Sequence, residues 1–263
     1  MKHLTIAFAA AALLAAPIAV AHEAPESIEL PVGDGHVTDH PATGNVYSCQ
    51  TAFRGGGAMH VGEWFHGDTW NPAEKPHVEG RVMWPNAEFE LSQRGDVLGV
   101  SGNSLPVEQP TGTFPISPND PVFRYDRNPN PIEEVALAFE IPAAPVRAAS
   151  PSCLPMGMIG FTLTGVAIYN ALDAAGRDAA AHEVQDLCDG HPQGRGQYHY
   201  HSASPCLPAP ATTPSLAGRS TATQSSACET RAARSSSTQI SMTAMAAQRP
   251  STSAAATMIT PTG

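Results

Sequence analysis

The sequence has little charge and no excess of basic residues. Charged side chains make up 14% of the 263 residues, and the formal net charge is −10. A typical soluble domain has ~25% charged residues. Because nucleic acids attract proteins through clustered lysine and arginine, this acidic chain is predicted not to bind nucleic acid. The 25 prolines argue against long helices and coiled coils, since proline lacks the backbone N–H and breaks a helix.

Several common catalytic motifs are also missing. The chain has no G-x-S-x-G elbow, no Walker phosphate-binding loop and no Rossmann glycine pattern. The run from His182 to Asp186 resembles the H-E-x-x-H motif of zinc proteases, but Asp186 stands where the second histidine belongs. These absences favour a protein without enzymatic activity.

One long apolar run is present, at the start of the chain. Residues 4–20 are apolar, basic Lys2 precedes them, and Ala19-Val20-Ala21 supplies a small-residue cleavage pattern. A membrane anchor is the alternative, but the run contains Pro17 and is shorter than the ~20 residues a spanning helix needs. We therefore predict a signal peptide over residues 1–21, no transmembrane segment after its removal, and a periplasmic or secreted protein.

The middle of the chain predicts a mainly β fold, with a sandwich- or barrel-like core and long loops. Residues 22–45 form an extended lead-in, and residues 46–207 form a β-rich domain with short apolar runs between turn signals. A single short helix is predicted over Asp178–Leu187. The predicted strands are Val78–Trp84, Glu88–Ser92, Val97–Ser101, Glu134–Ile141 and Ile159–Tyr169.

The composition changes sharply in residues 208–263. Alanine, serine and threonine supply 34 of these 56 residues, and no aromatic residue occurs among them. A segment so poor in large apolar groups cannot offset the entropy lost on ordering. The pattern predicts a disordered low-complexity tail.

A motif near the end of the β-rich domain carries a family resemblance. Residues 188–192 read C-D-G-H-P, residues 198–201 read Y-H-Y-H, and Cys206 follows. This arrangement resembles the YHYH-domain family of exported bacterial proteins. The resemblance covers roughly Tyr47 to Leu207 and implies no established biochemical activity.

Members of that family continue with a second half that resembles G-[WY]-A-L-D-G and then D-L-D-x-C-H-G, which this chain lacks. In the reading frame that begins one nucleotide earlier, the codons of residues 217–227 permit G-W-A-L-D-G-Y-P-I-F-G, and those of residues 239–246 fall where the second motif would lie. We interpret the tail as frameshifted near Cys206, which leaves the domain incomplete. A genuine Ala/Ser/Thr linker is the alternative.

Four cysteines remain when Cys228, in the tail, is set aside as out of frame. An even number suits an oxidising compartment, and four cysteines allow three pairings. A Cys188–Cys206 bridge would close the histidine-rich loop, and a Cys49–Cys153 bridge would tie the first strand region to the start of the motif. Metal ligation by Cys188 is the less expected alternative in an exported protein.

The Y-H-Y-H run predicts a candidate metal site. In a strand, alternation places His199 and His201 on one face, and Tyr198 and Tyr200 on the other, where they pack inward. Two imidazoles on one face form a chelate for Zn²⁺ or Cu²⁺. Candidates for a third ligand are His191, Asp189 and His182. In the alternative interpretation, these histidines only satisfy hydrogen bonds in a disulfide-closed loop.

Three functions follow from these observations. The first is an exported protein that binds a divalent transition metal through His199 and His201, with His191 or Asp189. The second is a metal-free module of the envelope or exterior that binds a glycan or a protein through the aromatic stretch from Trp64 to Trp70. The third is a metallohydrolase with Glu183 or Asp186 as the base.

The frameshift hypothesis makes a prediction about the gene. We expect the nucleotide sequence for residues 208–246, read in the shifted frame, to encode both missing motifs. Sequencing this region tests the prediction directly, and codons that cannot encode the motifs would refute it.

Overall fold

A computed structural model describes residues 28–207 of the chain. The predicted signal peptide and the predicted low-complexity tail lie outside the described residues, so those expectations stay predictions. Residues 28–45, within the predicted extended lead-in, already carry two short strands, β1 and β2.

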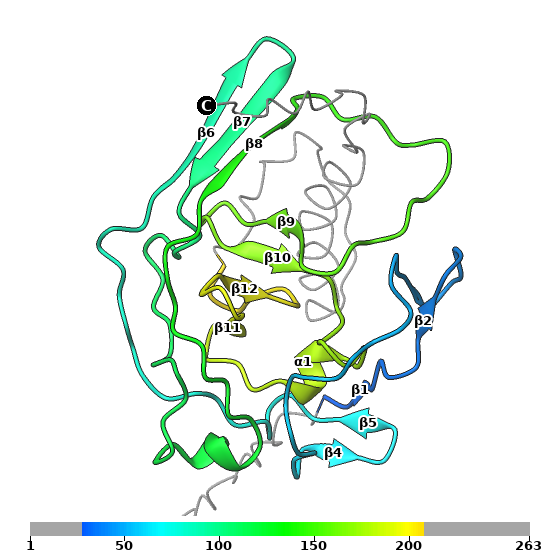
Figure 1. The fold of residues 1–263 in the computed structure, drawn as a ribbon, viewed down its shortest axis with the longest axis vertical. Coiled ribbons are helices and arrows are strands. Elements are labelled where there is room, and N and C mark those ends of the chain that lie inside the picture. Colours follow the sequence, from blue (N-terminus) through cyan, green and yellow to red (C-terminus); the bar gives the residue numbers. More distant parts are fainter. Residues whose placement is uncertain (1–27, 208–263) are drawn as a thin grey trace, which may run out of the picture.

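The described segment is mainly β, as predicted, and its strands form four small sheets (Figure 1). The longest strands have six residues, and the one α-helix of residues 28–207 has four. The elements are β1 (Leu30–Pro31), β2 (Val37–Thr38), β3 (Val46–Tyr47), β4 (Phe65–His66), β5 (Thr69–Trp70), β6 (Phe89–Arg94), β7 (Val97–Gly102), the 3-10 helix η1 (Pro121–Arg124), β8 (Leu137–Pro142), β9 (Met158–Phe161), β10 (Ala167–Tyr169), α1 (Ala179–His182), β11 (Gly190–Pro192) and β12 (Tyr198–Tyr200).

The sheet that carries the Y-H-Y-H run lies at the centre of the molecule (Figure 1). Its strand order is β11-β12-β10-β9, with β12 parallel to β10 and antiparallel to β11. Gly196 closes the turn between β11 and β12 at φ 81°, a backbone conformation that favours glycine. Because of this tight turn, His191 lies directly opposite His199 in the antiparallel register.

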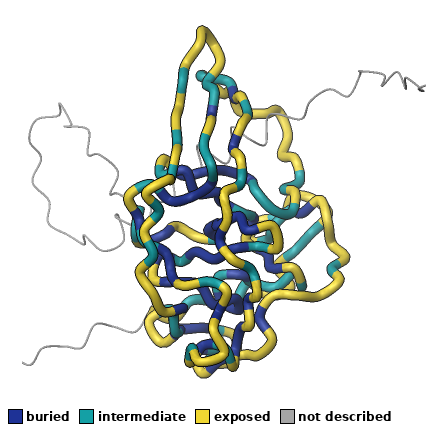
Figure 2. The backbone as a smooth tube through the Cα atoms, turned by 60° about the vertical axis from the view of Figure 1, so that its left-hand side comes forward, coloured by how far each residue is buried: buried dark blue, intermediate teal, exposed yellow. Residues whose placement is uncertain are grey.

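A second sheet, β6-β7-β8, projects from the central sheet. It is antiparallel throughout, and its β6–β7 hairpin extends from the rest of the chain with much of its surface exposed (Figure 2). Its base packs on the central sheet through a cluster that contains Val100, Ile141 and Phe161. These three strands confirm the strands predicted over Glu88–Ser92, Val97–Ser101 and Glu134–Ile141, with slightly different ends.

A third part of the core surrounds α1. The cluster contains Trp64, Trp70, Tyr125 and Val184, and Trp64 is 1% exposed. The Trp64 indole donates a hydrogen bond to the carbonyl oxygen of Ala181 over 2.9 Å. A helix this short is held by such tertiary contacts rather than by helix propensity.

Three of the predicted elements were wrong in their extent. Residues 78–84 form no strand and make only isolated bridges, because the segment pairs briefly with residues from two different regions. Residues 159–169 form two antiparallel strands instead of one, and Leu163, in the turn between them, is 73% exposed. The predicted helix is limited to Ala179–His182, since the chain turns extended at Glu183.

Both disulfides that close the predicted loops are present: Cys49–Cys153 and Cys188–Cys206. They agree with an oxidising compartment, where such bonds persist. In the described part of the chain, no helix is long and apolar enough to cross a membrane.

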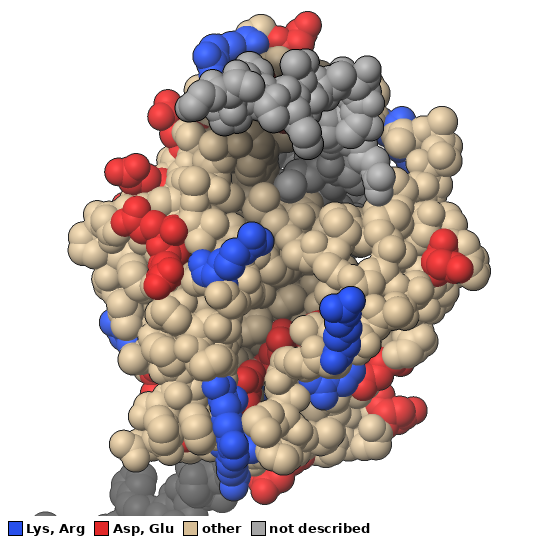
Figure 3. Space-filling model, in the orientation of Figure 1, with Lys and Arg blue, Asp and Glu red and all other residues tan. Residues whose placement is uncertain are grey.

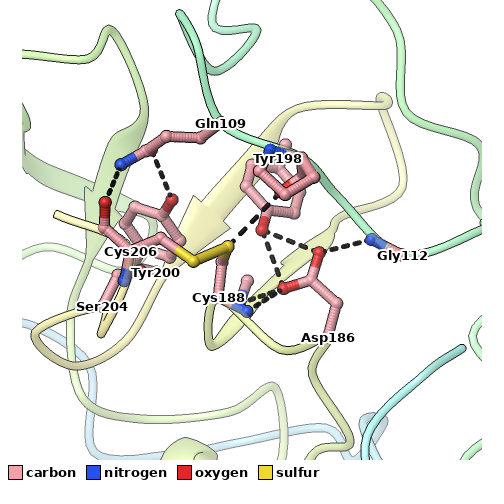
Figure 4. The surroundings of a disulfide bond; sticks show 10 residues. Gln109, Gly112, Asp186, Cys188, Tyr198, Tyr200, Ser204 and Cys206 are labelled. Atoms are coloured by element: carbon pink, nitrogen blue, oxygen red, sulfur yellow. Dashed lines mark hydrogen bonds between the residues drawn. A yellow bond between two sulfur atoms is a disulfide. The ribbon is translucent and has the colours of Figure 1, made fainter. Parts of the chain in front are cut away.

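Beside the Cys188–Cys206 bond, a buried carboxylate fixes the start of the β11–β12 hairpin (Figure 4). Asp186 is 1% exposed and accepts hydrogen bonds from the backbone N–H groups of Gly112, Cys188 and Gly190. The Tyr198 hydroxyl donates to it as well, at 2.8 and 2.9 Å from its two oxygens. Burial raises the pKa of Asp186, and these four donors oppose that shift.

This carboxylate yields a stability prediction. Asp186→Asn turns an amide N–H₂ towards groups that are all donors, so we expect the free energy of unfolding to fall by about 2–4 kcal/mol. Chemical denaturation measures the change, and Asp96→Asn, in the exposed β6–β7 turn, is the matched control. Equal stability of the two variants would contradict the role given to Asp186.

Candidate metal centre

Three histidines from the β11–β12 hairpin meet on one face of the central sheet. His191 pairs with His199 across the two strands, and His201 follows on the same face just after β12. One ligand atom from each of the three lies within 4.8 Å of the others. On the opposite face, Tyr198 and Tyr200 are fully buried in the core, as the alternation predicted.

For two of these histidines, the hydrogen-bond partners determine which ring nitrogen carries the hydrogen. The Nδ1 atom of His199 lies 3.1 Å from the carbonyl oxygen of Gln197, and the Nδ1 atom of His201 lies 2.6 Å from that of Asn170. A carbonyl oxygen only accepts, so both Nδ1 atoms donate and carry hydrogen. In the neutral rings, both Nε2 atoms therefore keep a free lone pair, and these two atoms lie 3.1 Å apart.

Burial keeps the rings of His191 and His199 neutral. His191 and His199 are 4% and 2% exposed. The pKa of each is well below the usual histidine value, first because burial penalises the charged form and then because a neighbouring histidine adds charge. The Tyr169 ring stacks on His199 with centroids 3.8 Å apart. Neutral imidazole is the form that binds a metal ion.

A carboxylate from outside the hairpin completes the group. The Oε2 atom of Glu183 lies 3.4 Å from Nε2 of His191 and 3.3 Å from Nε2 of His201. This oxygen is buried but accepts no hydrogen bond, and neither ring nitrogen of His191 has a hydrogen-bond partner. Buried polar atoms without partners are costly, and an ion between them would satisfy them.

The separations within this group suit a tetrahedral ion. With bonds of about 2.0–2.1 Å, two ligands of tetrahedral zinc lie roughly 3.3 Å apart. Three donor pairs come close to this value, at 3.1 Å between His199 and His201, 3.3 Å between His201 and Glu183, and 3.4 Å between His191 and Glu183. All three histidine ligand atoms lie within 4.8 Å of one another, so three nitrogens and one oxygen are candidates for a single ion.

Contacts from distant parts of the chain hold Glu183 in place. Lys75 donates to the carbonyl oxygen of Ala180 over 2.5 Å and also to the side-chain oxygen of Gln185. Asp126 accepts a hydrogen bond from the backbone N–H of Val184 over 3.0 Å. Together with the Trp64 bond to Ala181, these contacts fix the chain on both sides of Glu183.

Other residues predicted for the site lie elsewhere. Asp189 is not part of the three-histidine group, and its charge acts on Lys75. His182 lies 2.8 Å from Asp34 and is occupied by that pair. Asp186 is enclosed by its four donors, which leaves no free oxygen for a base. Trp64 and Trp70 are buried in the core and do not form an exposed aromatic platform.

The sequence contains only a weak indication that Glu183 belongs to the site. The H-E-x-x-D run drew attention to this residue only as a possible base, because its companion histidine points to Asp34 instead. Nothing in the spacing indicated that the chain after α1 faces the β11–β12 hairpin.

All four donor residues line a cavity of about 440 Å³. The space-filling view shows a hollow in the middle of one face, with acidic atoms inside it and basic side chains around it (Figure 3). Asp126, Asn128 and Gln193 also line the cavity. The donor group is thus accessible to small molecules although its rings are buried.

The family model of YHYH proteins matches residues 138–245. Over this segment the chain is similar to the YHYH protein family. The resemblance predicted from the motif is therefore confirmed, although the match begins later than Tyr47 and runs beyond Leu207. No curated protein and no solved structure gives a significant match. The YHYH segment contains every donor of the candidate centre.

The buried lysine beside the YHYH segment predicts a pH effect. Burial lowers the pKa of Lys75 to about 8, and the charges of Asp189 and Glu183 oppose this shift. From pH 8 to 10.5 the unfolded chain holds a proton that the folded chain has lost, so the free energy of unfolding rises with pH. Relative to Lys75→Met, the wild type should gain about 1–2 kcal/mol between pH 7.5 and 9.5.

Denaturation of both proteins at the two pH values measures this gain. Tyrosine ionisation affects both proteins alike and cancels in the difference. A difference that stays constant with pH would contradict the buried position of the charged Lys75.

Proposed function

We propose that this YHYH family protein is an exported protein that binds a divalent transition-metal ion through His191, His199 and His201, with Glu183 as the fourth donor. The residues meet at the edge of a cavity and come from two parts of the chain, the β11–β12 hairpin and the segment after α1. The proposal includes export to the periplasm or the exterior, for which the signal-like start and the two disulfides are the support.

The observation that carries the proposal is the approach of two nitrogens without hydrogen. Nε2 of His199 and Nε2 of His201 lie 3.1 Å apart, and each Nδ1 already donates to a carbonyl oxygen. Two lone pairs at this distance repel each other unless a cation lies between them. Metal-binding histidines typically donate their second nitrogen to such a carbonyl, which orients the ring.

A proton shared by the two rings is the competing explanation. It would make one of the two rings an imidazolium, with the Glu183 carboxylate 3.3 Å from Nε2 of His201 as its counter-charge. It would also leave both nitrogens of His191 without partners. A metal ion supplies the cation and also gives His191 and Glu183 a partner, so it accounts for all four residues.

Between the two metals that imidazoles favour, the spacing supports Zn²⁺. A square-planar Cu²⁺ site would bring adjacent nitrogens to roughly 2.8–2.9 Å, whereas tetrahedral zinc separates them by roughly 3.3 Å. The two separations that involve Glu183, 3.3 and 3.4 Å, are close to the tetrahedral value, and the 3.1 Å between His199 and His201 lies between the two values. Cu²⁺ remains the second candidate because imidazole binds it strongly.

Isothermal titration with Zn²⁺ and with Cu²⁺, followed by elemental analysis, tests the proposal. We expect one ion per chain in the wild type, and affinity for Zn²⁺ at least about 100-fold weaker in His199→Ala/His201→Ala, because two of the four donors are removed. The matched control is His40→Ala/His60→Ala, which removes two exposed histidines outside the group.

A second variant separates loss of binding from loss of folding. Glu183→Gln keeps the size of the side chain and should weaken Zn²⁺ binding while the circular dichroism spectrum stays that of the wild type. Stoichiometric zinc in the double-alanine variant, or none in a folded wild type, would refute the proposed site.

A further inference from the structure

The cavity in front of the candidate metal centre has a distinct chemistry of its own. Its wall combines apolar side chains, such as Met59, Met156 and Leu172, with the side-chain amides of Asn128 and Gln193. Its volume of about 440 Å³ falls within the ~300–1,000 Å³ typical of small-molecule sites. This mixture of surfaces suits a small organic molecule rather than a bare inorganic ion.

The acidic residues of the cavity are already engaged. Asp173 is bound by Arg177, with nitrogens 2.6 and 2.8 Å from one of its oxygens. Asp126 accepts two backbone hydrogen bonds, from Asn128 and Val184, and the charge of Lys75 acts on it. Glu183 belongs to the donor group of the metal.

Arg127 is the exception to this pairing. It is the one lysine or arginine that lines the cavity, it is exposed, and no carboxylate among residues 28–207 lies within ion-pair distance of it. Its guanidinium lies over the ring of Phe123, 5.3 Å from the ring centroid. Its hydrogen-bond donors therefore have no ionic partner among residues 28–207, and the exposed side chain borders the cavity.

A divalent ion would add further positive charge to this cavity. Three neutral imidazoles and one carboxylate leave a net charge of +1 at a divalent centre. Together with Arg127, the cavity would then present two positive groups to a ligand. An arginine fork and a metal ion both favour carboxylate oxygens.

We propose that the cavity binds a small organic carboxylate, which reaches the metal ion inside and the guanidinium of Arg127 at the mouth. This inference rests on the proposed metal site and adds its ligand class. Arg127 acts as the recognition residue for the anion, and the ion accepts a carboxylate oxygen as an additional ligand.

Cobalt-loaded protein tests this inference, because the visible absorption of Co²⁺ reports changes in its ligands. Succinate is the probe, and neutral succinamide and inorganic phosphate are the comparison compounds. We expect succinate to change the Co²⁺ spectrum saturably, succinamide to have no effect, and phosphate to act more weakly. The Co²⁺ content, measured after desalting, should be unchanged.

Two arginine variants then test the recognition residue. Arg127→Gln should weaken succinate binding roughly three- to five-fold, the size expected for an exposed charge pair. Arg124→Gln removes the same charge three residues away, from an exposed arginine that stacks on Tyr125 and does not line the cavity, and should leave binding unchanged.

Each other outcome has a defined meaning. Absence of Co²⁺ uptake would refute the proposed function, and the carboxylate site with it. Normal Co²⁺ uptake with no response to succinate would refute the carboxylate site alone. Equal weakening in both arginine variants would show general electrostatics instead of recognition by Arg127, and a response to phosphate but not to succinate would rule out an organic carboxylate.

Discussion

His199 and His201 approach each other through their Nε2 atoms, which lie 3.1 Å apart and carry no hydrogen when both rings are neutral. Backbone carbonyl groups enforce this arrangement, because each accepts the hydrogen of the opposite ring nitrogen. The rings cannot relieve the repulsion by rotation without losing those bonds and, for His199, the stacking against Tyr169. The backbone of the β11–β12 hairpin therefore presents a group that could hold a metal ion, and His191 and Glu183, which have buried polar atoms without hydrogen bonds, lie beside it.

The same four-residue motif builds both the centre and the core beneath it. Strand alternation sends Tyr198 and Tyr200 into the interior and the histidines to the cavity. The hydroxyl of Tyr198 binds Asp186, and that of Tyr200 binds Gln109, which in turn donates to the carbonyl oxygen of Cys206 (Figure 4). The Cys188–Cys206 disulfide joins the two ends of this hairpin. The tyrosines thus give the histidine rings a rigid support, which limits how far the donor atoms can move.

Local patterns in the sequence predicted the structural features that depend on neighbouring residues. The shared face of His199 and His201 and the mainly β class follow from strand alternation and turn signals. Long-range contacts set the rest. Glu183 reaches the site because Lys75, Trp64 and Asp126 hold the chain around it. The periodicity of the sequence does not predict such long-range contacts. The helix was predicted too long, since the chain becomes extended at Glu183.

An anomalous difference map from crystals of the zinc-loaded protein, measured on both sides of the zinc absorption edge, tests the central claim most directly. The account predicts one peak about 2.0–2.1 Å from the Nε2 atoms of His191, His199 and His201, with a Glu183 oxygen as the fourth neighbour. Ordered rings in the present arrangement, with no anomalous peak between them at saturating zinc, would contradict it.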